Sequence, residues 1–279
     1  MITLITALLL SAGPPVITAD SAIVVDLDSG TPLYEKNPDR IHAIASISKL
    51  LAIQVIYKRT LKLDAATTIE KSDYTHTKGG ARSRLIRGRS YKNSDLLHAA
   101  LMGSDNRAVV ALGRTVGFDF SILPRVMTIE AKSLGLMHTH FDDPTGISHA
   151  NVSTAREVSV ILKSILGIKA LKEITQKAEF TTSALERSGI PLVYRNTNIL
   201  TYKKSRKVLT GKTGFNSKAG WCVCTAIELP SGRRVGIVVL GSPTKHMRFR
   251  DARRLEKWAK SRAWKAPSNS LDNRLLKTN

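Results

Sequence analysis

The chain has 279 residues, of which 42% are hydrophobic and 23% are charged, as expected for one globular domain with room for a subdomain. Lysine and arginine number 43 against 22 aspartates and glutamates, which gives a formal net charge of +21. Such an excess indicates a polyanionic neighbour, either nucleic acid or an anionic wall or membrane surface. No RNA-binding signature or zinc-finger spacing accompanies the charge, which disfavours nucleic acid.

The first 19 residues, MITLITALLLSAGPPVITA, contain no charged side chain. Their apolar run is shorter than the roughly 20 residues that cross a bilayer. It is typical of the hydrophobic region of a signal peptide, although no lysine or arginine precedes it. We predict that residues 1–19 are a signal peptide cleaved after Ala19 and that the protein is exported. The alternative is a short buried first segment.

Two strands are predicted next, at residues 21–28 and 31–37, joined by a turn at Ser29-Gly30. Helices follow, as judged from apolar periodicity and capping residues. They are predicted at residues 46–58, 94–102, 106–116, 121–134, 154–167 and 168–177. The stretch FDDPTGISHANVS, ahead of the fifth helix, has the composition of a loop.

After residue 180 the pattern changes to strands, KVLTGKTGF, GWCVCTAIEL and RVGIVVLG, followed by a closing helix at 246–264. We predict an α/β fold in which the first hairpin and these strands form one antiparallel sheet flanked by helices. A helical subdomain, inserted at about 60–180 in a domain of residues 20–262, would leave a cleft beside the sheet. Residues 263–279 are predicted to be a polar tail.

Cys222 and Cys224 lie two residues apart in an apolar run. On a strand their Cα atoms would be roughly 6.5–7 Å apart, at or beyond the usual range for a disulfide. We therefore expect free, buried thiols. His138 and His140 have the spacing of metal ligands but no clear third partner, so we expect neither a metal nor another cofactor.

Three short motifs stand in contexts that suit chemistry. Ser46-Ile47-Ser48-Lys49 begins a predicted helix, so Ser46 and Lys49 share a face. Ser104-Asp105-Asn106 occurs at a helix break, and Lys212-Thr213-Gly214 occurs on a predicted strand. Each also has an ordinary structural interpretation. Ser46 and Ser104 could be helix caps, Lys49 could be a solvated lysine, and Lys212 could lie on a plain strand. Together, and in this order, they are the set found in penicillin-binding proteins and class A β-lactamases.

The resemblance extends beyond these motifs. ASISKL, LMGSDNRAVVAL, AKSLGLMHTHFDDPTGISHANVSTARE, YRNTN and LTGKTGFNSKAGWC resemble low-molecular-mass penicillin-binding proteins of the D-Ala-D-Ala peptidase family, over about residues 20–262. The stretches around DPTG and RNTN are most similar to its periplasmic DD-endopeptidase branch. The resemblance implies a periplasmic serine peptidase that acts on peptidoglycan peptides and is inhibited by β-lactams. We expect no stable membrane anchor, because the chain ends before the place where larger carboxypeptidases carry one.

The resemblance also implies roles for the motif residues. Ser46 would attack the peptide carbonyl while Lys49 accepts its proton, which requires a neutral lysine. Burial and a nearby cation, supplied by Lys212, would lower the pKa of Lys49. Ser104 would relay a proton to the leaving amine.

Five further residues are expected to bind substrate. Asn106 would hold the substrate backbone, Thr213 would contact a carboxylate or carbonyl, and Gly214 would let the peptide approach the strand. The N–H of Phe215, with that of the nucleophile, would form the oxyanion hole. Arg248 would grip a substrate carboxylate, or else be a surface arginine on the closing helix.

Three alternatives to an endopeptidase stay open. A D-Ala-D-Ala carboxypeptidase would need the same residues. A class A β-lactamase needs a glutamate for deacylation, and FDDPTGISHAN contains none. An inactive wall-binding protein would not need the intact motifs.

The basic stretch KGGARSRLIRGRSYK, at residues 78–92, holds six basic residues and no acidic one, so anionic wall polymers are possible partners.

Overall fold

The computed structural model describes residues 13–186 and 190–261. Residues 1–12 of the predicted signal peptide and the whole predicted tail at 263–279 lie outside the described residues, so both stay predictions. Across the described ranges, no helix is long and apolar enough to cross a membrane.

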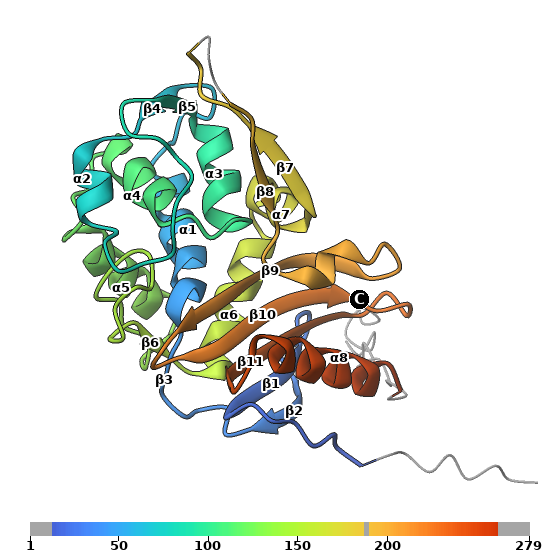
Figure 1. Ribbon diagram of the computed structural model, residues 1–279. Helices are drawn as coiled ribbons and strands as arrows, with labels where there is room; N and C mark the ends of the chain where they lie inside the picture. Colours follow the sequence, from blue (N-terminus) through green and yellow to red (C-terminus); the bar gives the residue numbers. More distant parts are fainter. Residues whose placement is uncertain (1–12, 187–189, 262–279) are drawn as a thin grey trace, which may run out of the picture.

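A five-stranded antiparallel sheet forms the centre of the fold, in the order β2-β1-β11-β10-β9 (Figure 1). Its strands are β1 (Ser21–Asp26), β2 (Pro32–Lys36), β9 (Lys207–Asn216), β10 (Gly220–Glu228) and β11 (Arg234–Ser242). The N-terminal hairpin therefore joins the C-terminal strands, which confirms the predicted sheet. All of β1 is buried, as expected for an apolar run covered on both faces.

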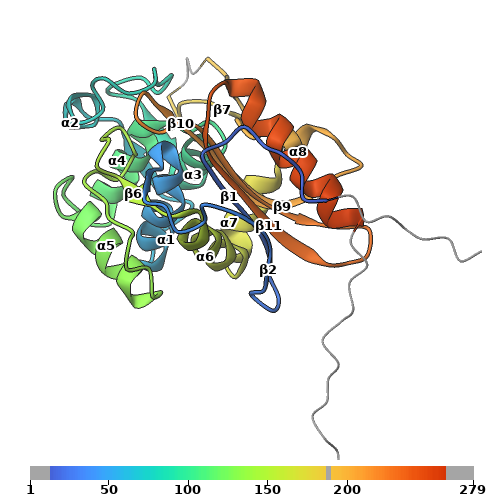
Figure 2. The same ribbon diagram turned by 90° about the horizontal axis from the view of Figure 1, so that it is seen from below.

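Helices cover both faces of this sheet (Figure 2). Helix α8 (Lys245–Ser261) lies on one face, and α6 (Ala155–Leu166) lies on the other with α1 (Lys49–Lys58) packed beside it. Because side chains alternate along a strand, Val24 belongs to the core under α8 and Ile23 to the larger core on the α6 side. The predicted α/β class is confirmed.

The other helices pack around α1 and α6, and one of them, α7, contacts the edge strand β9 (Figure 1). They are α2 (Lys71–Thr75), α3 (Asn93–Leu101), α4 (Asn106–Thr115), α5 (Leu123–Ser133) and α7 (Lys169–Gln176). Short strands pair between them: β3 (His42–Ala43) with β6 (Val152–Ser153), β4 (Ala66–Thr68) with β5 (Ser90–Lys92), and β7 (Glu179–Thr182) with β8 (Leu192–Arg195). The sequence did not predict these pairs, because two to four residues are too few to show a period of two.

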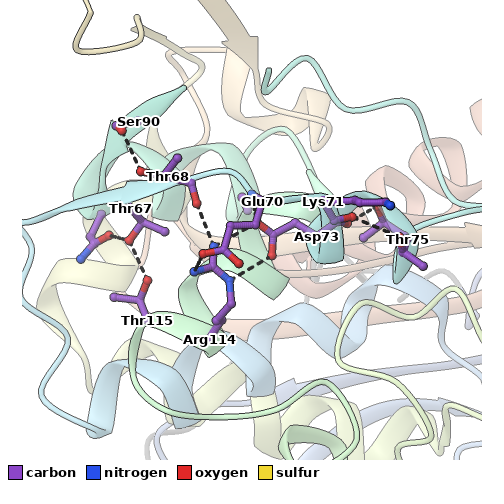
Figure 3. A network of polar contacts seen from close by, with 12 residues as sticks. Thr67, Thr68, Glu70, Lys71, Asp73, Thr75, Ser90, Arg114 and Thr115 are labelled. Carbon is purple, nitrogen blue, oxygen red and sulfur yellow. Dashed lines mark hydrogen bonds and ion pairs between the residues drawn. The ribbon is translucent and has the colours of Figure 1, made fainter. Parts of the chain in front are cut away.

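A network of ion pairs and hydrogen bonds around Arg114 joins elements on the helical side of the molecule (Figure 3). Arg114 of α4 contacts the carboxylates of Glu70 at 2.7 Å and Asp73 at 3.1 Å, and it donates to the carbonyl of Thr68 at 2.8 Å. The Asp73 side chain is fully buried, so removing Arg114 would leave a buried charge without its partner. This network ties the short helix α2 to α4 and holds the chain that leads into the basic stretch at 78–92.

Residues ahead of β1 are part of the folded domain. The side chains of Ile17 and Ala19 are buried under α8. The buried carboxylate of Asp251 accepts hydrogen bonds from Thr18 N at 2.9 Å and Ala19 N at 3.0 Å, while Lys36 Nζ donates to the carbonyl of Ala19 at 2.6 Å. Residues 17–19 therefore pack against the domain, and cleavage after Ala19 would remove these contacts. Cleavage after Ala19 stays a prediction.

The packing can be tested with two chains, one starting at Gly13 and one at Asp20. We expect the shorter chain to lose about 3 kcal/mol or more in free energy of unfolding, because it lacks the buried Ile17 and leaves Asp251 without its backbone donors. Urea unfolding followed by circular dichroism measures the difference. Equal stabilities would show that this segment is dispensable and would support cleavage after Ala19.

Candidate active site

The side chains of the three motifs meet where the sheet edge faces the helices. Ser46 lies in a 3-10 turn, η1 (Ala45–Ser48), and Lys49 is the first residue of α1. The sequence predicted one helix from Ser46, but its first turn is tighter than an α-helix. Ser104 lies in the loop between α3 and α4, and Lys212 lies on β9. Ser46 and Ser104 line a cleft of about 430 Å³.

The first pair is Ser46 with Lys49. Lys49 Nζ lies 2.7 Å from Ser46 Oγ and donates a hydrogen bond of 2.5 Å to the carbonyl of Thr145. Lys49 is fully buried. Burial lowers the pKa of Lys49 to about 7, and the charges of Asp143 and Asp105 act against that shift. A large fraction of this amine is therefore neutral at pH 7 and able to take a proton from the hydroxyl.

The second pair is Ser104 with Lys212. Lys212 Nζ donates to Ser104 Oγ at 2.8 Å and to the carbonyl of Thr213 at 3.0 Å. Burial lowers the pKa of Lys212 well below its usual value, and the charge of Lys49 lowers it further. The sequence predicted that burial and Lys212 would both lower the pKa of Lys49; burial is the cause of the shift, and Lys212 is not among its causes. A positive charge on Lys49 therefore opposes protonation of Lys212.

Asp105 holds Ser104 in place, a role that sequence reasoning missed. Ser104 has φ +60°, a left-handed conformation that is uncommon for a residue other than glycine. The buried carboxylate of Asp105 accepts from Ala108 N, from Ser83 Oγ at 2.7 Å and from Tyr194 Oη at 3.1 Å. Asp105 is thus the N-cap of α4, and its residue type at a helix start was a signal available in the sequence.

The loop at residues 142–151 supplies the carbonyl that meets Lys49, and sequence reasoning missed this too. Asp143 Oδ1 accepts from Thr145 N at 2.6 Å and from Gly146 N at 2.8 Å, which fixes the loop backbone. Gly146 has φ +81°, and a Cβ there would lie 2.0 Å from the carbonyl oxygen of Ala45. The Asp-Pro-Thr-Gly turn chemistry was visible in the sequence, but a backbone carbonyl has no signature of its own.

The edge strand β9 lies directly against the turn that carries Ser46. A Cβ on Gly214 would stand 2.6 Å from the carbonyl oxygen of Ile44 and 3.3 Å from Ser46 N. Glycine is therefore required for this close approach. Phe215 follows at the mouth of the cleft, half exposed and stacked on Trp221. The backbone of β9 and that of Ser46 thus border the same space, the arrangement that an oxyanion hole needs.

Of the remaining expected site residues, Thr213 and Arg248 line this cleft, and Asn106 is not among its lining residues. Asn106 is buried at the start of α4, and Thr213 Oγ1 donates to Thr197 Oγ1 at 2.8 Å. Arg248 is buried in the first turn of α8 and lines the cleft, so the surface-arginine reading is wrong. Its Nη1 donates to the carbonyls of Gly214 and Cys222, and burial lowers its pKa to about 10. Arg248 therefore braces β9 against β10.

The two cysteines and the possibility of a metal site were also considered from the sequence. Cys222 and Cys224 are free and fully buried, and burial raises the pKa of each thiol to about 12. Both thiols are therefore protonated and unreactive at neutral pH. Within residues 13–186 and 190–261, no group of three or more His, Cys, Asp or Glu side chains could hold a metal ion.

Comparison with known proteins identifies relatives along nearly the whole chain. A family model described as D-alanyl-D-alanine carboxypeptidase matches residues 9–244. A D-alanyl-D-alanine endopeptidase of Escherichia coli is 33% identical over 253 residues, which is 91% of this chain and 81% of that protein. One of Pseudomonas aeruginosa is 33% identical over 266 residues, 92% of this chain and 85% of that protein. Among solved structures, the Streptomyces K15 DD-transpeptidase superposes with a TM-score of 0.81 at 27% identity, covering 88% of this chain and 98% of that one.

The contribution of the loop to Lys49 can be measured directly. Because the negative charge of Asp143 raises the pKa of Lys49, Asp143→Asn should lower that pKa below its value of about 7. Titration of the Lys49 Cε resonance by NMR gives the value. Asp142→Asn, at the exposed neighbouring position, should leave it unchanged. A rise in Asp143→Asn would mean that the carboxylate acts by keeping Lys49 buried rather than by its charge.

Proposed function

The chain belongs to the D-alanyl-D-alanine carboxypeptidase family of serine peptidases, and we propose that it cleaves peptidoglycan cross-links as a DD-endopeptidase. The observation that carries this proposal is the pair of buried Ser–Lys contacts at one cleft, Ser46 with Lys49 and Ser104 with Lys212. Relatives at 33% identity are named endopeptidases, which favours that branch over the carboxypeptidases.

Acylation proceeds from the first pair. Ser46 Oγ attacks the carbonyl carbon of the D-alanyl residue while its proton passes to the neutral amine of Lys49, 2.7 Å away. The carbonyl oxygen becomes an anion and takes hydrogen bonds from the backbone N–H groups of Ser46 and Phe215. Removing one such donor typically costs a factor of about 10² to 10³ in rate.

Release of the leaving group uses the second pair. Ser104 Oγ passes a proton to the amine of the departing peptide, and Lys212, at 2.8 Å, orients this hydroxyl and replenishes its proton. The carbonyl carbon is then bonded to Ser46 Oγ as an ester. Attack of water on that ester, with its proton taken by the same lysine–serine system, frees the carboxylate and restores Ser46.

The cleft offers room for the substrate on the β9 side. It extends from Ser46 past Gly214 to Ile199 and Tyr202, and its volume of about 430 Å³ falls in the ~300–1,000 Å³ range of sites that bind small molecules. An extended peptide would run along β9 and contact Asn106 and Thr213. Arg248, which lines the same cleft, would attract the free carboxylate on the leaving side.

β-Lactams would enter the same site and acylate Ser46. The loop at 142–151 contains no glutamate, and the carboxylate of Asp143 is engaged by backbone N–H groups at 2.6 to 2.8 Å. The loop therefore offers no glutamate, and the carboxylate of its buried Asp143 is not free to activate a water for hydrolysis of a penicilloyl ester. Slow release of the β-lactam follows, which favours a penicillin-sensitive peptidase over a β-lactamase.

We infer that the protein works in the periplasm, where the peptidoglycan substrate lies.

The proposal is tested by digestion of purified muropeptides. We expect wild-type protein to convert cross-linked dimers into monomers, seen by mass spectrometry as two products whose masses sum to the dimer plus one water. Uncross-linked pentapeptides should lose their terminal alanine more slowly. Ser46→Ala should release no product from either substrate. Faster release of alanine than of monomers would replace the endopeptidase by a carboxypeptidase, and cleavage by Ser46→Ala would refute the site.

A further inference from the structure

A second hollow, which we call the arginine groove, lies beside the active-site cleft. Its volume is about 770 Å³, and the eight residues that line it include Tyr74, Arg82, Arg84, Arg107 and Leu192. Three of the eight carry a positive charge, and no acidic side chain is among the described residues that line the groove. Two of the arginines come from the basic stretch at 78–92, to which the peptidase mechanism assigns no role.

Aromatic rings and backbone hold two of the arginines in place. The guanidinium of Arg107 lies 3.2 Å from the ring centroid of Tyr74 and donates to the carbonyl of Leu85 at 2.9 Å. That of Arg84 lies 4.6 Å from the ring centroid of Tyr194. Tyr74 is itself carried by α2, which Arg114 ties to α4 (Figure 3). Stacking fixes the plane of a guanidinium and leaves N–H groups at its edge for an anion.

Consecutive residues of the chain line the cleft and the groove. Ala81 lines the cleft, and the next residue, Arg82, lines the groove. Ser83, also in the groove wall, donates to Asp105, the residue after Ser104. Because an extended peptide advances about 3.3 Å per residue, a substrate held beside Ser104 needs only a few more residues to reach these arginines.

We propose that the arginine groove binds carboxylates of the peptidoglycan peptide that lie outside the scissile bond. This inference rests on the proposed peptidase function and extends its substrate site. A guanidinium fork accepts a carboxylate through two parallel hydrogen bonds, and a branched peptide cross-link carries several free carboxylates. The groove therefore selects anionic, cross-linked peptides over short neutral ones.

The test compares two double variants that lose the same charge. Arg82→Ala with Arg84→Ala removes two exposed arginines of the groove, whereas Arg253→Ala with Lys257→Ala removes two exposed cations of α8. Each is combined with Ser46→Ala, and calorimetry measures the Kd for a purified cross-linked muropeptide. We expect Kd to rise about fivefold for the groove variant, as for the loss of two exposed ion pairs, and to change less than twofold for the α8 variant.

Three results would overturn the groove assignment. The first is an unchanged Kd in the groove variant. An equal rise of Kd in the α8 variant counts in the same way, because it would mean that the muropeptide is attracted by the net charge alone. The second is equal affinity of wild-type protein for a muropeptide whose carboxylates have been amidated. The third is a groove variant that loses affinity for polyphosphate and keeps it for the muropeptide, which would make the ligand a phosphate polymer.

Failure of the groove and failure of the peptidase proposal give different results. With Ser46 intact, the groove variant should react with a small β-lactam at the wild-type rate, because that inhibitor does not reach Arg82 or Arg84. A slower reaction would mean that the substitutions act through Ser83 and Asp105 on Ser104, and would overturn the groove. A wild-type protein that binds the muropeptide through the groove without cleaving it would refute the peptidase and keep the groove.

Discussion

The site depends on the burial of one amine. Lys49 has no exposed surface, and its Nζ lies between Ser46 Oγ and the carbonyl of Thr145. Desolvation of the charged form is the largest cause of its lowered pKa. Separate elements supply these groups, because α1 carries the lysine, the turn before it carries Ser46, and the loop at 142–151 supplies the carbonyl. A change that admits water at this point would restore an ordinary lysine.

Two residues at the site have strained backbone conformations, and contacts from the surrounding structure hold them there. Ser104 and Ala45 both have positive φ. Ser104 is itself proposed to take part in the reaction, and Ala45 directly precedes Ser46. Such conformations persist only where neighbouring contacts determine them. For Ser104 those contacts come from Asp105 and its partners, and for Ala45 they come from the tight fit against Gly146 and Gly214. Rigidity here keeps Ser46 and Lys49 at hydrogen-bond distance.

The sequence predicted the sheet and the grouping of its strands because long apolar runs such as β1 and β11 carry a clear pattern. It also singled out Ser46, Lys49 and Lys212, since short motifs reveal side chains. It did not reveal the carbonyl of Thr145, the burial of Arg248 or the packing of Ile17 under α8. Those features follow from contacts between segments far apart in the chain, which no local pattern encodes.

The central claim is that buried Lys49 serves as the base for Ser46, and the pH dependence of acylation tests it most directly. Stopped-flow measurement with a β-lactam free of titratable groups near pH 7 gives the rate of acyl-enzyme formation, and mass spectrometry of the adduct locates it. The account expects an adduct on Ser46 and a rate that rises through about pH 7, as Lys49 loses its proton. A rate that rises only toward pH 10, the range of an ordinary lysine, or an adduct on another serine would contradict it.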